Sequence, residues 1–232
     1  MPVDSSNSTR LNKFLALHMG LSRRQADNLI TAGKVTINGK PAGLGVQVNS
    51  EDKVAVSGQP ISGKTELVYI AFNKPRGYVC SRRTQGDTPT IYDILPSEYR
   101  QLKTVGRLDK DSSGLLILTN DGDFAQSMTH PSNYKVKRYK IALNEPLQPL
   151  HQQMISDFGI ELPDGPSKLS LERVDDERKQ WIVVMSEGRN RQIRRTFAAL
   201  GYTVTSLHRT NFGLYALGDI KPGKTLKVAK IT

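Results

Sequence analysis

The chain of 232 residues is 37% hydrophobic and 24% charged, and this length accommodates one or two globular domains with cores of their own. No apolar run approaches the ~20 residues that cross a bilayer, and the N-terminus lacks the basic-then-apolar order of a secretory signal. The single cysteine, Cys80, excludes an internal disulfide, and the four histidines are too scattered for a helical zinc site. These features predict a cytoplasmic protein that binds no metal and no membrane.

Positive charge is the first indication of function. Lys and Arg number 33 against 22 Asp and Glu, a formal net charge of +11, which favours a polyanionic partner. The basic residues also gather locally. Arg23 and Arg24 are adjacent. A second cluster consists of Arg189, Arg191, Arg194 and Arg195.

Two short helices are predicted near the N-terminus. Leu11, Phe14 and Leu15 follow the spacing of one helical face. A second helix over about residues 23 to 32 begins after Ser22, which is expected to cap it together with a glutamine three residues on. The first turn of this second helix presents two arginines beside free backbone amides, an arrangement that suits phosphate.

A small β-structure is predicted after these helices. Val35 and Ile37 alternate with polar residues before Asn38 and Gly39, a pair that strongly favours a hairpin turn. Four further valines predict two more short strands: Val46, Val48, Val54 and Val56.

The order of these helices, hairpin and basic pair resembles the RNA-binding domain named after ribosomal protein S-four. The resemblance covers residues 9–57. It implies binding to structured RNA through phosphates and shape. The contacts are expected from Arg10, Lys13, Arg23, Arg24 and Lys34.

The segment Gly58–Thr65 matches the P-loop pattern letter for letter. A P-loop needs a helix directly after it, whereas the residues that follow are β-rich. Pro60 also removes one of the backbone amides that would cradle a phosphate. We therefore expect residues 58–66 to be a linker between two domains.

The rest of the chain, residues 67–232, has the pattern of a larger α+β domain. Its β-rich stretches are residues 67–72, 78–81, 115–119, 138–143, 181–185 and 225–231. One of them, Leu115–Leu118, is a continuous apolar run, which predicts a strand buried on both faces. The polar loop before it carries Asp109 close to Arg107, and a loop held by a buried strand is a good position for a catalytic group.

A further helix is predicted between Asn190, as its cap, and Gly201. Its apolar face would consist of Ile193, Thr196, Phe197 and Leu200. Its basic face would carry Arg191, Arg194 and Arg195.

Four segments, in order, resemble the motifs of the pseudouridine synthases, and the N-terminal module selects the RsuA-like ribosomal RNA subfamily. They are Asn73–Gly77, Gly106–Asp109, Lys137–Tyr139 and Arg189–Arg195. The resemblance implies a catalytic domain with a central, mainly antiparallel sheet flanked by helices. It also implies that the protein is a monomer that binds ribosomal RNA or a ribosomal subunit assembly intermediate.

The resemblance also implies the site residues. Asp109 is expected to be the catalytic aspartate. Tyr139 is expected to lie against the target base and is the candidate base for the final loss of the C5 proton. Arg194 is the first choice for the basic partner of Asp109, and Arg195 stays open as the alternative. Substrate binding is expected from Lys74, Arg107, Arg191 and Arg195.

Isomerising uridine to pseudouridine changes no oxidation state, so the expected reaction needs no cofactor. The aspartate can attack the sugar as a nucleophile or act as a base in an elimination to a glycal. Two other functions stay open. One is a non-catalytic ribosome-binding or assembly factor; the other is a nucleoside or glycoside hydrolase that uses Asp109 and Asp111.

Overall fold

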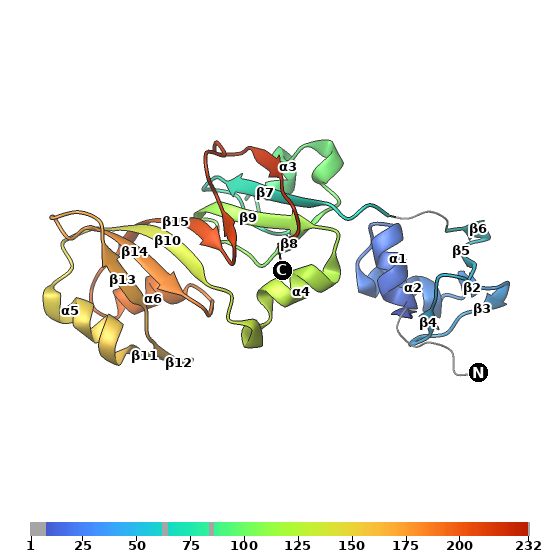
Figure 1. The fold of residues 1–232 in the computed structure, drawn as a ribbon, viewed down its shortest axis with the longest axis horizontal. Helices are drawn as coiled ribbons and strands as arrows, with labels where there is room; N and C mark the ends of the chain where they lie inside the picture. Colours follow the sequence, from blue (N-terminus) through green and yellow to red (C-terminus); the bar gives the residue numbers. More distant parts are fainter. Residues whose placement is uncertain (1–7, 62–64, 84–85, 232) are drawn as a thin grey trace. The chain divides into compact units, whose positions relative to one another are not determined.

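The computed structural model describes residues 8–61, 65–83 and 86–231, which form two compact units (Figure 1). One unit comprises Met1–Val68 with Asn120–Gly122, and the other comprises Tyr69–Thr119 with Asp123–Thr232. Among the described residues, no helix has the length and apolar character that a membrane crossing requires.

The smaller unit places two helices on small sheets. A four-stranded antiparallel sheet has the order β3-β2-β5-β6, and β1 pairs with β4. The elements are β1 (Thr9–Arg10), α1 (Leu11–His18), α2 (Arg23–Thr31), β2 (Val35–Ile37), β3 (Lys40–Pro41), β4 (Gln47–Val48), β5 (Val54–Val56) and β6 (Gln59–Pro60). Their core consists of Leu11, Leu15, Ala26, Ile30, Val35, Val48, Val54 and Val56.

Local sequence explains the second helix and the hairpin. The Ser22 hydroxyl accepts from the Gln25 amide at 3.2 Å, and the Gln25 side chain accepts from the Ser22 amide at 2.8 Å. Both halves of the predicted capping box are therefore present. Asn38 and Gly39 have φ values of 52° and 80°, which a type I′ hairpin turn requires.

The expected linker begins later than residue 58. Gln59 and Pro60 form β6, which pairs with β5, so the first part of this segment belongs to the N-terminal sheet. Ser62, Gly63 and Lys64, at the centre of the P-loop pattern, lie outside the described residues. The next regular element is the strand β7 (Tyr69–Lys74) and not the helix that a P-loop requires.

The larger unit is built on a mixed, mainly antiparallel sheet with the path β13-β14-β10-β15-β9-β7-β17. Strands β16 and β8 pair at its side with β15 and β9, and the β15–β9 pair is parallel. The strands are β7, β8 (Lys103–Val105), β9 (Ser113–Thr119), β10 (Lys137–Leu143), β11 (Ile160–Leu162), β12 (Gly165–Ser167), β13 (Ser170–Arg173), β14 (Gln180–Met185), β15 (Val204–Phe212), β16 (Tyr215–Ala216) and β17 (Thr225–Lys227). The helices are α3 (Ile91–Ile94), η2 (Ser97–Tyr99), α4 (Gly122–Thr129), η3 (Pro131–Asn133), α5 (Pro149–Gln153), the π-helix η4 (Met154–Phe158) and α6 (Gln192–Ala198).

The core of this unit lies around β7 and β9. All four residues Leu115–Leu118 are fully buried, which confirms the predicted strand with two covered faces. On one face, Phe124 and Met128 of α4 pack in one cluster with Leu115 and Ile117. The predicted α+β class with a mainly antiparallel sheet is confirmed.

Two expected strands differ from the sequence pattern, and several strands lie outside the predicted stretches. Residues 78–81 form no strand; Val79 makes an isolated bridge with Thr90. The last strand ends at Lys227, and the chain beyond it is held by the Tyr215 hydroxyl, which donates to Ala229 O at 2.9 Å. The sequence does not predict the longest strand, β15, because its many polar residues hide the alternation of apolar and polar side chains that marks a strand. Its pairing with β10 is also interrupted by register shifts.

Candidate active site

A cavity of about 620 Å³ lies in the larger unit. This volume is within the range of sites that enclose a small molecule or one nucleotide. Its walls come from the loop before β9, the start of β10, the segment before α6, and β15. The lining includes Arg107, Asp109, Tyr139, Arg191, Arg194, Arg209 and Phe212.

The sheet brings the two expected catalytic residues to one place. In the sheet register, Tyr139 of β10 pairs with Arg209 of β15, and Arg209 pairs with Gly114 of β9. Gly114 lies near the start of β9, just after the loop that carries Asp109. This approach depends on glycine: a Cβ at Gly114 would lie 2.2 Å from the Arg209 carbonyl oxygen, and the φ of Gly114 is +104°. Tyr139 is 7% exposed.

The buried Lys74 side chain holds the loop that carries Asp109. Its ammonium group donates to the carbonyl oxygens of Asp109 at 3.0 Å, Ser112 at 2.8 Å and Pro75 at 3.1 Å. The side chain is completely buried, and burial lowers the pKa of Lys74. Lys74 was expected to bind substrate; in the structure all three of its hydrogen bonds go to backbone carbonyl oxygens, so it holds the loop in position.

The Asp109 carboxylate is partly exposed and has an arginine beside it. Arg191 Nη1 lies 3.9 Å from Asp109 Oδ2 and 3.5 Å from Asp111 Oδ2. Arg191 has a φ of 48° in the left-handed region and occupies the position before α6. The predicted cap, Asn190, lies one residue earlier, and no side chain caps this helix.

Arg194, the first choice for the basic partner, makes a different contact. Its Nη2 donates to the carbonyl oxygen of Asp111 at 3.2 Å, and its Nη1 donates to that of Val204 at 2.6 Å. Burial lowers the pKa of Arg194, while Asp111 and Asp109 act in the opposite direction. Arg194 thus braces the loop, and the ion pair with Asp109 is made by Arg191.

Arg195, the alternative partner for Asp109, pairs with a different carboxylate in the structure. Its guanidinium pairs with both carboxylate oxygens of Asp164 at 2.8 and 2.9 Å. Arg189 also contacts Asp164, at 3.0 Å. The hydrogen bonds from Arg195, followed by the charge of Arg189, hold the pKa of Asp164 below its usual value. The predicted arginine cluster therefore splits into two pairs with different partners.

Arg209 and Lys137 are cavity-lining cations that are not among the predicted site residues. Arg209 is 2% exposed, donates through Nε to Leu115 O at 2.8 Å, and lies over Phe212, with Cζ 4.8 Å from the ring centroid. Its Nη2 has no hydrogen-bond partner among the described residues. Lys137, the first residue of the Lys137–Tyr139 motif, donates to three carbonyl oxygens, those of Lys135, Ser186 and Glu187. No sequence signal identifies Arg209, because only strand register brings it to the cavity.

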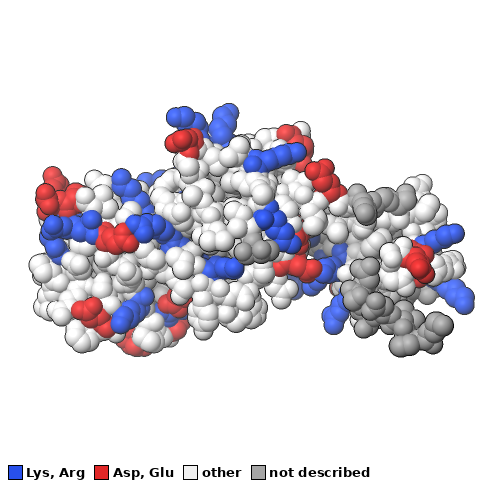
Figure 2. All heavy atoms as spheres, viewed as in Figure 1, with Lys and Arg blue, Asp and Glu red and all other residues white. Residues whose placement is uncertain are grey.

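The remaining predicted residues are at the surface. Arg107 is exposed and lines the cavity. In the smaller unit, Arg23, Arg24 and Lys34 are exposed, as is Arg10, whereas Lys13 is half-buried. Figure 2 shows Lys and Arg side chains distributed over both units, with Asp and Glu between them.

Comparison with known proteins identifies the family. Residues 68–199, more than half of the chain, match the family described as RNA pseudouridylate synthase. The chain belongs to this family. Residues 9–54 match the S4 domain, so the synthase carries an N-terminal S4 domain before its catalytic domain.

Relatives that match over most of their length identify the subfamily of the synthase. It is 37% identical over 216 residues to "Ribosomal small subunit pseudouridine synthase A" of Pasteurella multocida, covering 90% of this chain and 91% of the relative. It is 36% identical over 221 residues to "Ribosomal large subunit pseudouridine synthase B" of Bacillus subtilis, covering 92% and 89%. The predicted RsuA/RluB-type family and the enzyme class, an RNA pseudouridine synthase, are confirmed.

A solved structure agrees with this assignment. The "Crystal structure of pseudouridylate synthase" is 34% identical, covers 95% of this chain and 96% of its own, and has a TM-score of 0.67. The coverage extends over both units, so the whole architecture is that of a pseudouridine synthase with an S4 domain.

Proposed function

We propose that this synthase isomerises a specific uridine in ribosomal RNA and that Asp109 is its catalytic residue. The observation that carries the proposal is a partly exposed Asp109 carboxylate in the wall of a nucleotide-sized cavity, on a loop held by the buried Lys74. The two curated relatives are named for the small and the large ribosomal subunit. We infer that ribosomal RNA, free or in a subunit assembly intermediate, is the substrate here as well.

The chemistry breaks the glycosidic bond between N1 of uracil and C1′ of ribose, turns the uracil, and joins C5 to C1′. The C5 proton then leaves. Asp109 is suited to the first step, either as the nucleophile at C1′ or as the base that forms a glycal. The uridine must leave its stack to enter the cavity, which costs on the order of a few kcal/mol. Exposed Arg107 is available to occupy the space it leaves or to bind the RNA backbone.

Tyr139 is proposed to lie against the flipped uracil and to take part in removing the C5 proton, directly or through water. Arg191 supplies positive charge beside the reacting carboxylate. The balance of this reaction requires no electron carrier and no added metal, so we propose that the synthase works without a cofactor.

The smaller unit is proposed to supply most of the RNA affinity. Arg23 and Arg24 occupy the first turn of α2, where their charges add to the positive end of the helix dipole. Arg10, at the start of α1, and Lys34 add further exposed charge. This division leaves recognition mainly to the S4 domain and chemistry to the larger unit.

Tritium release from ribosomal RNA transcripts labelled at C5 of uridine tests the activity. We expect wild-type protein to release tritium with chelator present, Asp109→Asn to release none in single turnover while it still binds RNA, and Asp111→Asn to stay active. Turnover of Asp109→Asn at more than a few per cent of the wild-type rate would contradict the assignment. RNA binding without turnover by the wild type would support an assembly factor, and release of free uracil would support a hydrolase.

A further inference from the structure

An open groove lies beside the active-site cavity. It has a volume of about 460 Å³ and is lined by Tyr134, Val136, Lys168, Val184, Met185, Ser186 and Glu187. Tyr134, Met185, Ser186 and Glu187 also line the cavity itself. The two hollows therefore share a rim. A nucleotide at this shared rim lies next to the cavity, where a neighbour of a flipped uridine would be expected.

We propose that the groove binds the base of a nucleotide adjacent to the target uridine and that Tyr134 stacks on that base. This inference rests on the proposed function, because it assumes an RNA strand that delivers a flipped uridine. It assigns to the larger unit a recognition element outside the reacting pocket.

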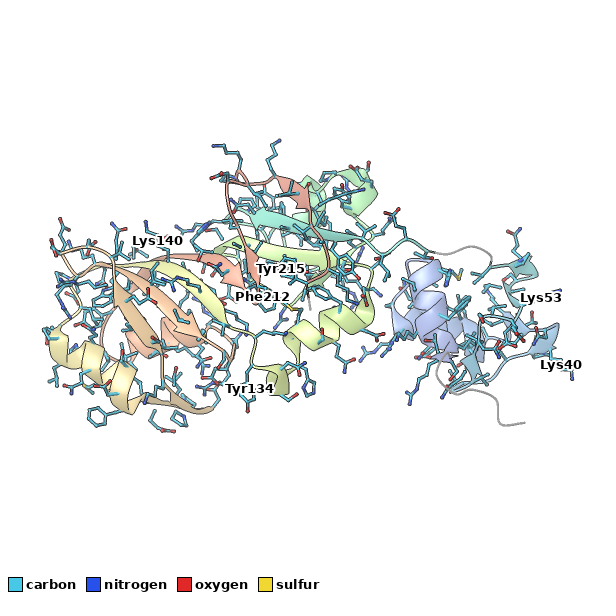
Figure 3. All side chains as sticks on the ribbon, viewed as in Figure 1. Lys40, Lys53, Tyr134, Lys140, Phe212 and Tyr215 are labelled. Carbon is cyan, nitrogen blue, oxygen red and sulfur yellow. The ribbon has the colours of Figure 1, made fainter. Side chains whose placement is uncertain are left out.

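Tyr134 is unusual in exposure and in backbone conformation. Its side chain is at the surface between α4 and β10 (Figure 3), and the residue is 72% exposed. Its φ of 42° lies in the left-handed region, which a tyrosine rarely adopts. Its hydroxyl has no hydrogen-bond partner among the described residues. Nothing in the fold therefore requires an aromatic ring here, and strained backbone of this kind concentrates at functional positions.

The flanking backbone holds Tyr134 in place. On one side, Asn133 donates through its side chain to Ser127 O at 2.7 Å. On the other side, Lys137 donates to Lys135 O at 3.2 Å, and Val136 O accepts from the Gly213 amide at 2.8 Å. These bonds fix the backbone on both sides of Tyr134, so less backbone entropy is lost when a base stacks on the ring.

The chemistry of the groove favours a nucleotide over a protein side chain. Single-stranded bases bind to proteins by stacking on open aromatic faces, with cations beside them for the phosphates. Val136, which is 50% exposed, adds apolar surface, and Lys168 adds an exposed cation. The acidic member, Glu187, is already partnered: it accepts from the Gln192 side chain and lies 3.4 Å from Arg189 Nε. Its repulsion of a phosphate is thereby reduced.

The test compares Tyr134→Ala with a matched control on defined RNA. Wild-type protein first maps the target uridine in ribosomal RNA transcripts, and a short RNA around that uridine is then made intact or with an abasic nucleotide on its 5′ or its 3′ side. We expect Tyr134→Ala to bind the intact RNA about 5- to 150-fold more weakly, the range for one stacked base. Phe158→Ala removes an equally exposed ring, 76% exposed on η4, and should bind as the wild type does.

Two further results separate stacking from a structural role. Tyr134→Phe should restore binding, and Tyr134→Gly, which adopts positive φ freely, should melt no lower than wild type yet bind as weakly as Tyr134→Ala. On one of the two abasic RNAs, wild type and Tyr134→Ala should bind equally.

Wild-type affinity in Tyr134→Ala would overturn the inference. An undiminished loss on both abasic RNAs would also overturn it, because Tyr134 would then contact the RNA elsewhere than at a base next to the target uridine. Either result leaves the proposed function intact if wild type still forms pseudouridine. Failure of wild type to form pseudouridine in any ribosomal RNA would overturn both.

Discussion

Replacing Lys74 with Met tests whether a buried ammonium group holds the catalytic loop. The change keeps most of the side-chain volume but removes three hydrogen bonds to the carbonyl oxygens of Pro75, Asp109 and Ser112. Hydrogen bonds to a charged group contribute about 1.5–3 kcal/mol each. Burial of the ammonium group, which lowers the pKa of Lys74, offsets much of this sum.

The net loss for Lys74→Met is expected to be about 2–4 kcal/mol, because three carbonyl groups lose their charged donor while the cost of burying that charge is relieved. For a unit of this size that corresponds to a fall in Tm of roughly 5–15 °C. Fluorescence of Trp181, the single tryptophan and a fully buried residue of the larger unit, reports this transition.

The effect on the reaction is expected to be larger than the effect on stability. Misplacing a reacting group by about 1 Å costs on the order of 100-fold in rate. The single-turnover rate of Lys74→Met should therefore fall about 100-fold at a temperature where the protein is folded, while its Kd for RNA changes less than about threefold, because Lys74 does not reach the surface.

The matched control is Lys110→Met in the same loop. Lys110 is exposed and, among the described residues, its side chain bonds only to Thr88 Oγ1, at 3.2 Å, so its loss should change stability by less than about 0.5 kcal/mol. A wild-type Tm and a wild-type rate in Lys74→Met would refute the positioning role. Equal losses in the two variants would show that the charge of the loop matters and not the buried contacts.

Three other perturbations address separate parts of the structure. Gly114→Ala, whose Cβ would meet Arg209 O at 2.2 Å, should destabilise the larger unit by at least about 2 kcal/mol and slow turnover; wild-type melting would contradict the close strand approach. The lowered pKa of Asp164 means that its stabilisation is present above the unfolded value of 3.8 and is lost as pH falls through the folded value. Asp164→Asn should therefore lower Tm at pH 7, and this difference should shrink, not grow, on acidification below pH 3.8. The double variant Arg23→Ala/Arg24→Ala should weaken RNA binding and reduce the dependence of the Kd on salt, because fewer counterions are released. Its rate at saturating RNA should not change. An unchanged salt dependence of the Kd would show that these arginines do not contact the RNA.

The features determined by sequence alone are those that depend on neighbouring residues. Ser22 and Gln25 specify a helix start because both partners of the capping box lie within one turn. Asn38-Gly39 specifies a hairpin because both residues tolerate positive φ. The run Leu115–Leu118 specifies a strand with two buried faces. The ordered motifs identified the family, and the family placed Asp109 and Tyr139 in one site.

Tertiary structure decided which charged groups meet. Lysine and arginine are usually exposed to solvent. In this structure, however, Lys74 is buried under a loop, and Arg195 is held by Asp164, 31 residues away in the sequence. Arg209 reaches the cavity because β15 inserts between β10 and β9, a pairing that no local pattern in its own sequence predicts. The reason is physical: a side chain's partner depends on strand order and register, which arise from contacts between distant segments, whereas caps and turns are complete within a few residues.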